Sequence, residues 1–85
     1  MIMMNKILVT IVVPMIELTY DIYIPVSKNT KIAIDLLAET INELTEGHFP
    51  KKEKYTLINS EGVILDKKKN IKENGIKNGD KLILI

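Results

Sequence analysis

The chain has 85 residues, 46% of them hydrophobic, which is enough for one small domain spanning residues 1–85. Its 12 basic residues are all lysines and are nearly balanced by 11 acidic ones, so the sequence lacks the excess positive charge that a nucleic-acid partner requires. It contains no cysteine, which excludes a disulfide, a thiolate metal site and a cysteine nucleophile.

A strand hairpin is predicted at the N-terminal end. Residues 7–13 form an apolar run that is too short to span a membrane, so we expect no transmembrane segment, and alternation from Lys6 to Val13 predicts a strand. Pro14 ends this strand, and a second strand from Leu18 to Ile24 follows after a short connection. Because the connection is short, the two strands should pair antiparallel. The residues of the first strand expected to face the core are Ile7, Val9, Ile11 and Val13.

A helix is predicted after the hairpin. From Lys31 the spacing of apolar residues changes from two to about 3.6, the repeat of an α-helix, with Asn29 and Thr30 as candidate N-caps. Gly47 is expected at the C′ position that ends the helix. The apolar stripe expected to face a sheet consists of Ala33, Leu36, Leu37, Thr40, Ile41 and Leu44.

Further strands are predicted at Tyr55–Ile58, Val63–Leu65 and Lys81–Ile85. Ile71 and Ile76 should anchor the irregular segment before the last strand. Since that strand is apolar on both faces, we expect it in the middle of the sheet, beside and parallel to the first strand. This order predicts an α+β fold of the ubiquitin-like β-grasp type, with a mixed sheet of four or five strands packed on one helix.

The segments Thr30–Asp35, Leu57–Gly62 and Gly75–Leu82 resemble the YukD/EsaB family of small ubiquitin-like accessory proteins. These proteins belong to the type VII (WXG100, or ESX) secretion system of Gram-positive bacteria. The most distinctive of the three segments is the ending Gly-Ile-x-Asn-Gly-Asp-x-Leu. In physical terms, its Asn-Gly pair at 78–79 is typical of a tight turn, and Asp80 can accept hydrogen bonds within that turn. The resemblance implies a cytoplasmic accessory factor that binds membrane components of the secretion machine at the inner face of the cell membrane.

Two other functions compete with this interpretation. A modifier or sulfur-carrier relative is the first alternative, but such proteins act through a flexible C-terminal Gly-Gly, and here no glycine follows Gly79. The second is a regulatory β-grasp domain that recognises a small GTPase or nucleic acid. No catalytic motif, cofactor-binding loop or metal-ligand spacing surrounds the single histidine, His48, so we expect no enzyme activity, cofactor or metal.

The sheet face away from the helix is the predicted partner-binding surface. Alternation in the two central strands places Leu8, Val12, Ile83 and Ile85 on it. Ile58 is expected to join them in one patch, although the pattern of its strand leaves open which face is inward. The patch would bind a protein partner or a second copy of the chain; the alternative is that it is covered by neighbouring lysines. The lysines within 67–72 form either a solvated loop or a surface for anionic lipid or an acidic partner.

Overall fold

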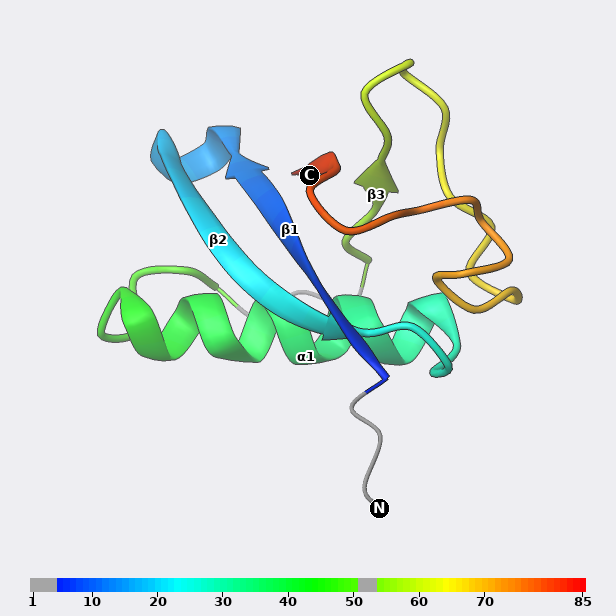
Figure 1. Ribbon diagram of the computed structural model, residues 1–85. Coiled ribbons are helices and arrows are strands. Elements are labelled where there is room, and N and C mark those ends of the chain that lie inside the picture. The colour runs from blue at the N-terminus through cyan, green and yellow to red at the C-terminus, as the bar shows by residue number, and fades with distance from the viewer. Residues whose placement is uncertain (1–4, 51–53) are drawn as a thin grey trace.

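The computed structural model describes residues 5–50 and 54–85. In chain order, its elements are strand β1 (Lys6–Val13), a short 3-10 helix (Pro14–Ile16), strand β2 (Leu18–Pro25), helix α1 (Thr30–Leu44), strand β3 (Leu57–Ile58) and strand β4 (Lys81–Leu84). The helix lies across one face of the strands (Figure 1).

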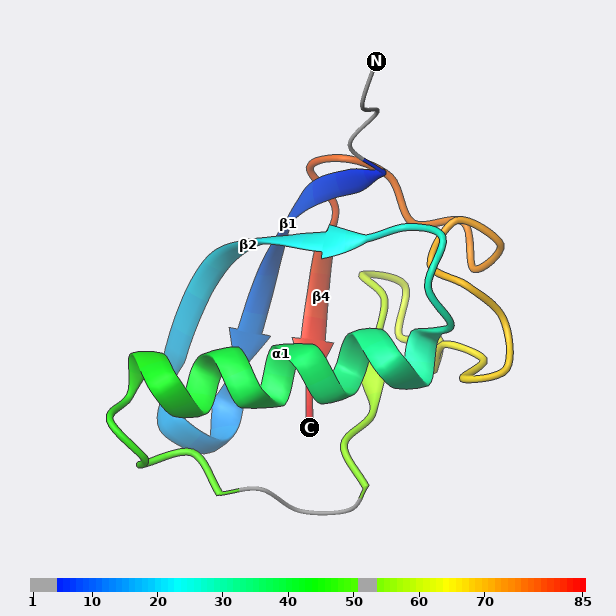
Figure 2. The ribbon, with the colours of Figure 1, turned by 90° about the horizontal axis from the view of Figure 1, so that it is seen from below.

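The strands form one mixed sheet of four strands in the order β2-β1-β4-β3. Strand β1 pairs antiparallel with β2 and parallel with β4, and β4 pairs antiparallel with β3. Figure 2 shows β4 beside β1 and running in the same direction. The predicted central position of the last strand is therefore confirmed, and one helix on one face of this sheet makes the fold the predicted β-grasp.

The hydrophobic core lies between the sheet and α1. Val9, Ile11 and Val13 of β1 are buried, and Ile7 packs against them, which confirms the predicted inward face of this strand. The same alternation places Leu82 of β4 in the core. Residues between these positions point to the opposite face, so the two central strands have one buried face and one open face.

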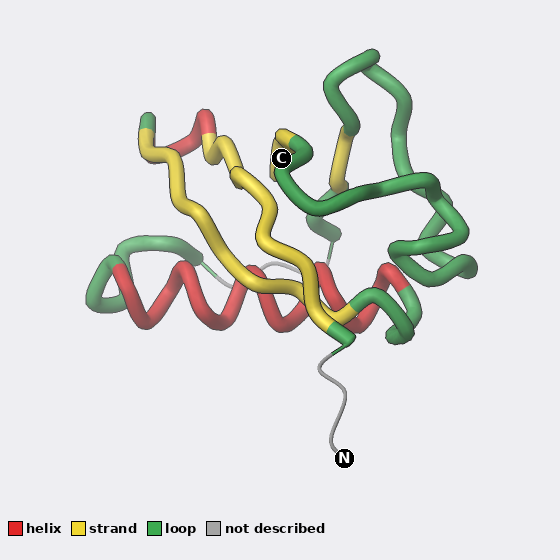
Figure 3. The backbone as a smooth tube through the Cα atoms, in the orientation of Figure 1, coloured by secondary structure: helices red, strands yellow, loops and turns green. Residues whose placement is uncertain are grey.

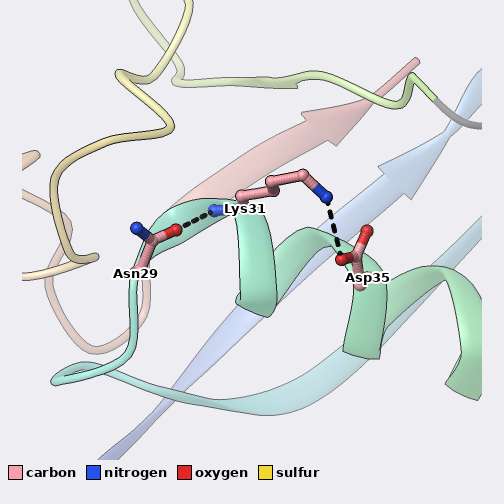
Figure 4. A network of polar contacts seen from close by, with 3 residues as sticks. All are labelled: Asn29, Lys31 and Asp35. Atoms are coloured by element: carbon pink, nitrogen blue, oxygen red, sulfur yellow. Dashed lines mark hydrogen bonds and ion pairs between the residues drawn. The ribbon is translucent and has the colours of Figure 1, made fainter.

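Helix α1 begins at the predicted N-cap, Asn29. Its side-chain oxygen accepts a hydrogen bond from the backbone N–H of Lys31 at 3.0 Å, and the Lys31 ammonium lies 3.3 Å from the carboxylate of Asp35 (Figure 4). The cap contributes about 1 kcal/mol to stability, whereas an exposed ion pair of this spacing contributes about 0.3–0.5 kcal/mol. The cap is therefore the stronger local signal for where the helix starts.

The predicted apolar stripe of α1 is partly wrong. Leu36 and Leu44, which were expected to face the sheet, are 46% and 56% exposed, and Thr40 is only half-buried. Ile34 and Ala38, which were not in the predicted stripe, are buried instead. The residues that α1 buries are Thr30, Ala33, Ile34, Leu37, Ala38 and Ile41. Two neighbouring rows of the helix are apolar, and the packing against the sheet decides which of them is covered.

Helix α1 also ends earlier than predicted, with Thr45 as its C-cap. The left-handed C′ position is occupied by Glu46, with φ of 53°. Gly47 follows with φ of 87°, and its N–H donates to the carbonyl of Asn42 at 2.8 Å. Gly47 therefore occupies the C″ position, one residue beyond the predicted C′ position, and its hydrogen bond to Asn42 ends the helix.

The segment after the helix contains less strand than predicted. Strand β3 is limited to Leu57–Ile58 rather than Tyr55–Ile58. The predicted strand Val63–Leu65 is reduced to a single bridge at Ile64. The reason is a tight turn, in which the Asn59 side chain accepts hydrogen bonds from the backbone N–H groups of Glu61 and Val63, both at 2.9 Å. This turn keeps the following residues from forming a longer strand.

The irregular segment between β3 and β4 crosses the end of the sheet (Figure 3, green). Ile71 and Ile76 are buried, which confirms their predicted anchoring role. Asn74 holds the segment to the start of α1, because its side-chain nitrogen lies 3.0 Å from the hydroxyl of Thr30 and 2.9 Å from the carbonyl of Asp66. Thr30 is fully buried, so this hydrogen bond satisfies a polar group that water cannot reach.

Candidate protein-interaction surface

Four β-branched side chains form a row across the sheet, on the face opposite α1. Val12 on β1 is paired with Ile83 on β4, and Ile83 is paired with Ile58 on β3. Ile58 is in turn bridged to Ile64. Because paired residues point to the same face of a sheet, these four residues, hereafter the apolar row, lie side by side on adjacent segments.

The apolar row faces outward because the residues that alternate with it are in the core. Leu57 precedes Ile58 and Leu82 precedes Ile83, and both leucines are fully buried. Val12, Ile83 and Ile58 are half-buried, whereas Ile64 is 64% exposed. An open sheet face usually carries polar residues, so a continuous row of apolar side chains on it is a feature that needs an explanation.

The turn before β4 sets the register that builds the row. The side-chain oxygen of Asn78 accepts a hydrogen bond from the N–H of Leu8 at 2.9 Å, and the N–H of Gly79 donates to the carbonyl of Leu8 at 2.7 Å. The N–H of Thr10 donates to the carbonyl of Asp80 at 2.9 Å. These bonds attach the chain to the edge of β1 before β4 begins, and so fix which residues of the two strands lie opposite each other.

The predicted turn chemistry of this segment is confirmed. Gly79 has φ of +90°, a backbone conformation that favours glycine, and the carboxylate of Asp80 accepts the N–H of Lys77 at 2.8 Å. The segment with the most distinctive sequence resemblance therefore has a structural role, and it is not itself part of the apolar row.

Ile85 lies beside the apolar row, two residues along the chain from Ile83. It is 47% exposed, and this spacing places it on the same outward face. Its backbone is held in the sheet by Thr56: the N–H of Thr56 donates to the carbonyl of Ile85 at 2.7 Å, and the N–H of Ile85 donates to the carbonyl of Thr56 at 3.0 Å. The structure therefore brings Ile85 together with three other predicted residues, Val12, Ile58 and Ile83.

Leu8 shares the outward face but lies apart from the row. Between them, Thr10 is paired with Lys81 on one side and with Asp21 on the other. The hydroxyl of Thr10 donates to the carboxylate of Asp21 at 2.8 Å. This polar step across three strands interrupts the apolar surface, so the single patch expected from alternation is divided in two.

Sequence reasoning did not identify Ile64. The strand expected at Val63–Leu65 was not assigned a buried face, so no residue in it was placed on the outer surface. Leu65 is buried, and alternation from that position would have pointed Ile64 outward.

Other groups that invite a chemical interpretation lie away from the apolar row. Burial raises the pKa of Tyr55, whose hydroxyl donates to the carbonyl of the exposed residue Pro50. Nδ1 of His48 lies 2.6 Å from the carbonyl of Thr45 at the end of α1. Within residues 5–50 and 54–85, no three His, Cys, Asp or Glu side chains gather where they could hold a metal ion. Over the same ranges, no helix is long and apolar enough to cross a membrane.

The chain is similar to known proteins in its three-dimensional structure. No protein-family model and no curated protein matches the chain. The ubiquitin-like domain of the Mycobacterium tuberculosis type VII secretion protein EccD1 matches it with a TM-score of 0.77 and 18% identity, over 96% of this chain and 99% of that one. The EccD5 ubiquitin-like domain from Mycobacterium xenopi matches with a TM-score of 0.77 and 16% identity, over 94% and 92%.

A chain of the MycP5-free ESX-5 inner membrane complex is also similar, with a TM-score of 0.78 and 15% identity. The match covers 95% of this chain but only 21% of that one, so the likeness is to one part of a larger protein. At such identities the likeness establishes the fold, which is that of a ubiquitin-like β-grasp domain.

Proposed function

We propose that this protein is a non-catalytic protein-interaction module, and that it acts as a cytoplasmic accessory component of a Gram-positive type VII secretion system. It binds a protein partner through the apolar row on the open face of the sheet. The observation that carries the proposal is the pairing of Val12, Ile83, Ile58 and Ile64 across adjacent segments.

The apolar row suits a flat hydrophobic contact. Its β-branched side chains are stiff and are held by the sheet backbone, so little conformational entropy is lost when a partner covers them. Covering a half-exposed isoleucine contributes about 1 kcal/mol, so the row supplies a sizeable part of the roughly 8 kcal/mol that a micromolar complex requires. Lys81 and Asp21 lie beside the row and give it a polar rim, as protein interfaces usually have.

Two observations support a secretion system as the setting. The segment Gly75–Leu82 resembles the YukD/EsaB family, and the fold is similar to ubiquitin-like domains of EccD proteins. One such similar domain belongs to an inner-membrane secretion complex. We therefore take a subunit of a membrane complex as the partner, which would bring this protein to the inner face of the cell membrane.

Secretion in the native bacterium tests the proposal. The gene is deleted and complemented with the wild type, with Ile83→Lys or with Ile32→Lys, and the export of WXG100 proteins into the medium is measured. Ile32 is 47% exposed on α1, on the other side of the sheet, and so is a matched control for the same change. We expect export to fall in the deletion strain and with Ile83→Lys, and to be restored by Ile32→Lys.

Full export from the deletion strain would contradict the role in secretion. Full export with Ile83→Lys, at a wild-type level of the variant, would contradict the role of the apolar row and leave the choice of system standing.

A further inference from the structure

A second apolar surface lies between the open edge of the sheet and the helix. Strand β2 and α1 enclose a groove of about 350 Å³. Its floor includes Ile22 of β2 and Leu36, Leu37 and Thr40 of α1. The groove is on the helix side of the sheet and shares no residue with the apolar row, so it is a separate site.

The backbone of β2 is open along this groove. Strand β2 is an edge strand whose only neighbour in the sheet of the described residues is β1. The N–H of Val26 donates to the carbonyl of Asn5 at 2.8 Å, so these two residues form a hydrogen-bonded pair of the antiparallel ladder. Such pairs alternate with pairs whose N–H and C=O groups point away from each other.

Counting along the ladder from that pair identifies the groups that face the open edge. Leu8 and Thr10 direct their backbone groups toward β4, as their hydrogen bonds to the turn before β4 demonstrate. Their partners in β2, Tyr23 and Asp21, therefore direct theirs away from the sheet, and Thr19 does the same. The backbone groups of these three alternate residues of β2 can thus form hydrogen bonds with an added strand.

A strand added to this edge would place every second side chain over the groove, because side chains alternate between the faces of a sheet. There it would meet Ile22 and the exposed side of Leu36. An occupant with apolar residues at alternate positions would cover both of them. This accounts for the position of Leu36, a leucine that the core does not use.

The charged residues of the groove indicate which residues a bound peptide should carry at one of its ends. The charged residues that line it are Lys6 and Lys28, both exposed, and Lys6 is paired with Pro25 at the end of β2. The ion pair found in the described residues joins Lys31 to Asp35 and involves neither of these lysines. Two lysines at the same end of an apolar groove favour carboxylates in that part of a ligand.

We propose that the edge of β2 and the adjoining face of α1 bind an extended peptide segment of a protein partner by strand addition. The segment carries apolar residues at alternate positions and acidic residues at the end that lies beside Lys6 and Lys28. This is the β-augmentation mode of peptide recognition, in which backbone hydrogen bonds supply affinity and alternate side chains supply specificity. It adds a second binding site to the one proposed above, and it does not depend on that site.

Titration of the full chain with synthetic peptides tests this inference, with backbone amide NMR shifts as the readout. The probes are Glu-Asp-Val-Thr-Ile-Thr-Val and the same residues in reverse order, one for each strand direction, and a control with lysines in place of the acidic pair. We expect one acidic peptide to shift the amides of Thr19, Asp21 and Tyr23 and those around Leu36. The lysine peptide should bind at least about fivefold more weakly.

Paired variants locate the contacts. The double change Lys6→Glu and Lys28→Glu should weaken the acidic peptide about fivefold and strengthen the lysine peptide. Leu36→Ala should weaken both, whereas Leu44→Ala, an exposed leucine of the same helix outside the groove, should not.

Three results would overturn the inference. The first is shifts confined to the apolar row, the second is equal affinity for acidic and lysine peptides, and the third is no shift at millimolar peptide. The remaining possibility is that β2 pairs with a second copy of the chain, which sedimentation equilibrium of the protein alone detects as a dimer. A dimer that Tyr23→Pro disrupts and that peptide does not displace would assign the edge to a second copy instead.

Discussion

Val12 on β1 and Ile83 on β4 lie opposite each other in the parallel ladder, side by side on the open face of the sheet. The residues just before them, Ile11 and Leu82, are paired in the same way and are fully buried against α1. One register therefore builds the core and the candidate surface together. A slip of one residue in this ladder would exchange the two faces of β4.

Adjacent lysine substitutions in β4 should have opposite consequences for folding. Leu82→Lys would place a charge without a partner in the core and should prevent folding at 25 °C, because a buried unpaired charge costs several kcal/mol. Ile83→Lys can extend its ammonium into water and should cost no more than about 1 kcal/mol. Circular dichroism melting of the two variants is the measurement. Similar melting temperatures for both would contradict the assignment of the faces.

Two leucines of α1 test which side of the helix faces the sheet. Leu37 is fully buried, so Leu37→Ala should lower the free energy of unfolding by about 3 kcal/mol. Leu44 is 56% exposed, and Leu44→Ala should lower it by less than about 0.5 kcal/mol. Urea denaturation distinguishes these values. Comparable losses in the free energy of unfolding for the two variants would contradict the observed packing and favour the apolar stripe predicted from the sequence.

Asn74 should be worth more to stability than its position in a loop suggests. Asn74→Ala removes its hydrogen bonds to Thr30 and to the carbonyl of Asp66 and leaves a buried hydroxyl without this partner, at a cost of about 2 kcal/mol. Asn78→Ala removes one exposed hydrogen bond to Leu8 and should cost about 1 kcal/mol. The order of the two losses in urea denaturation is the test, and a larger loss for Asn78→Ala would contradict it.

Alkaline pH should destabilise the fold partly through Tyr55. Burial raises the pKa of this hydroxyl above its ordinary value of 10.0, so the folded state holds the proton more tightly than the unfolded state. Its contribution is complete below pH 10.0 and is lost as the pH rises through the folded-state pKa. The stability advantage of the wild type over Tyr55→Phe should therefore shrink above that pH. Urea unfolding curves that remain equally far apart at every pH would contradict this.

The sheet could be predicted from the sequence because its signals are local and agree with one another. Alternation from Lys6 to Val13, the short connection to β2 and the Asn-Gly pair at 78–79 each indicate one geometry. The run Lys81–Ile85 is apolar on both faces, and this property alone predicts its central position. Agreement across such levels is what makes a sequence specify a fold.

The helix face and the continuity of the surface could not be predicted because they depend on contacts between elements. Leu36 and Ile34 are both apolar, and the angle at which α1 crosses the sheet decides which one is buried. Leu8 is outward as expected, but the polar step that isolates it combines side chains from three strands, Thr10, Asp21 and Lys81. Alternation within one strand contains no information about such a combination.

Photo-crosslinking in living cells tests most directly whether the apolar row contacts a partner. A photoreactive amino acid is placed at Ile64, the most exposed member of the row, and in a matched strain at Ile32 on α1. We predict a covalent adduct with a membrane subunit of the type VII secretion system from position 64, and none with that subunit from position 32. No adduct from position 64, or the same adduct from both positions, would contradict the account.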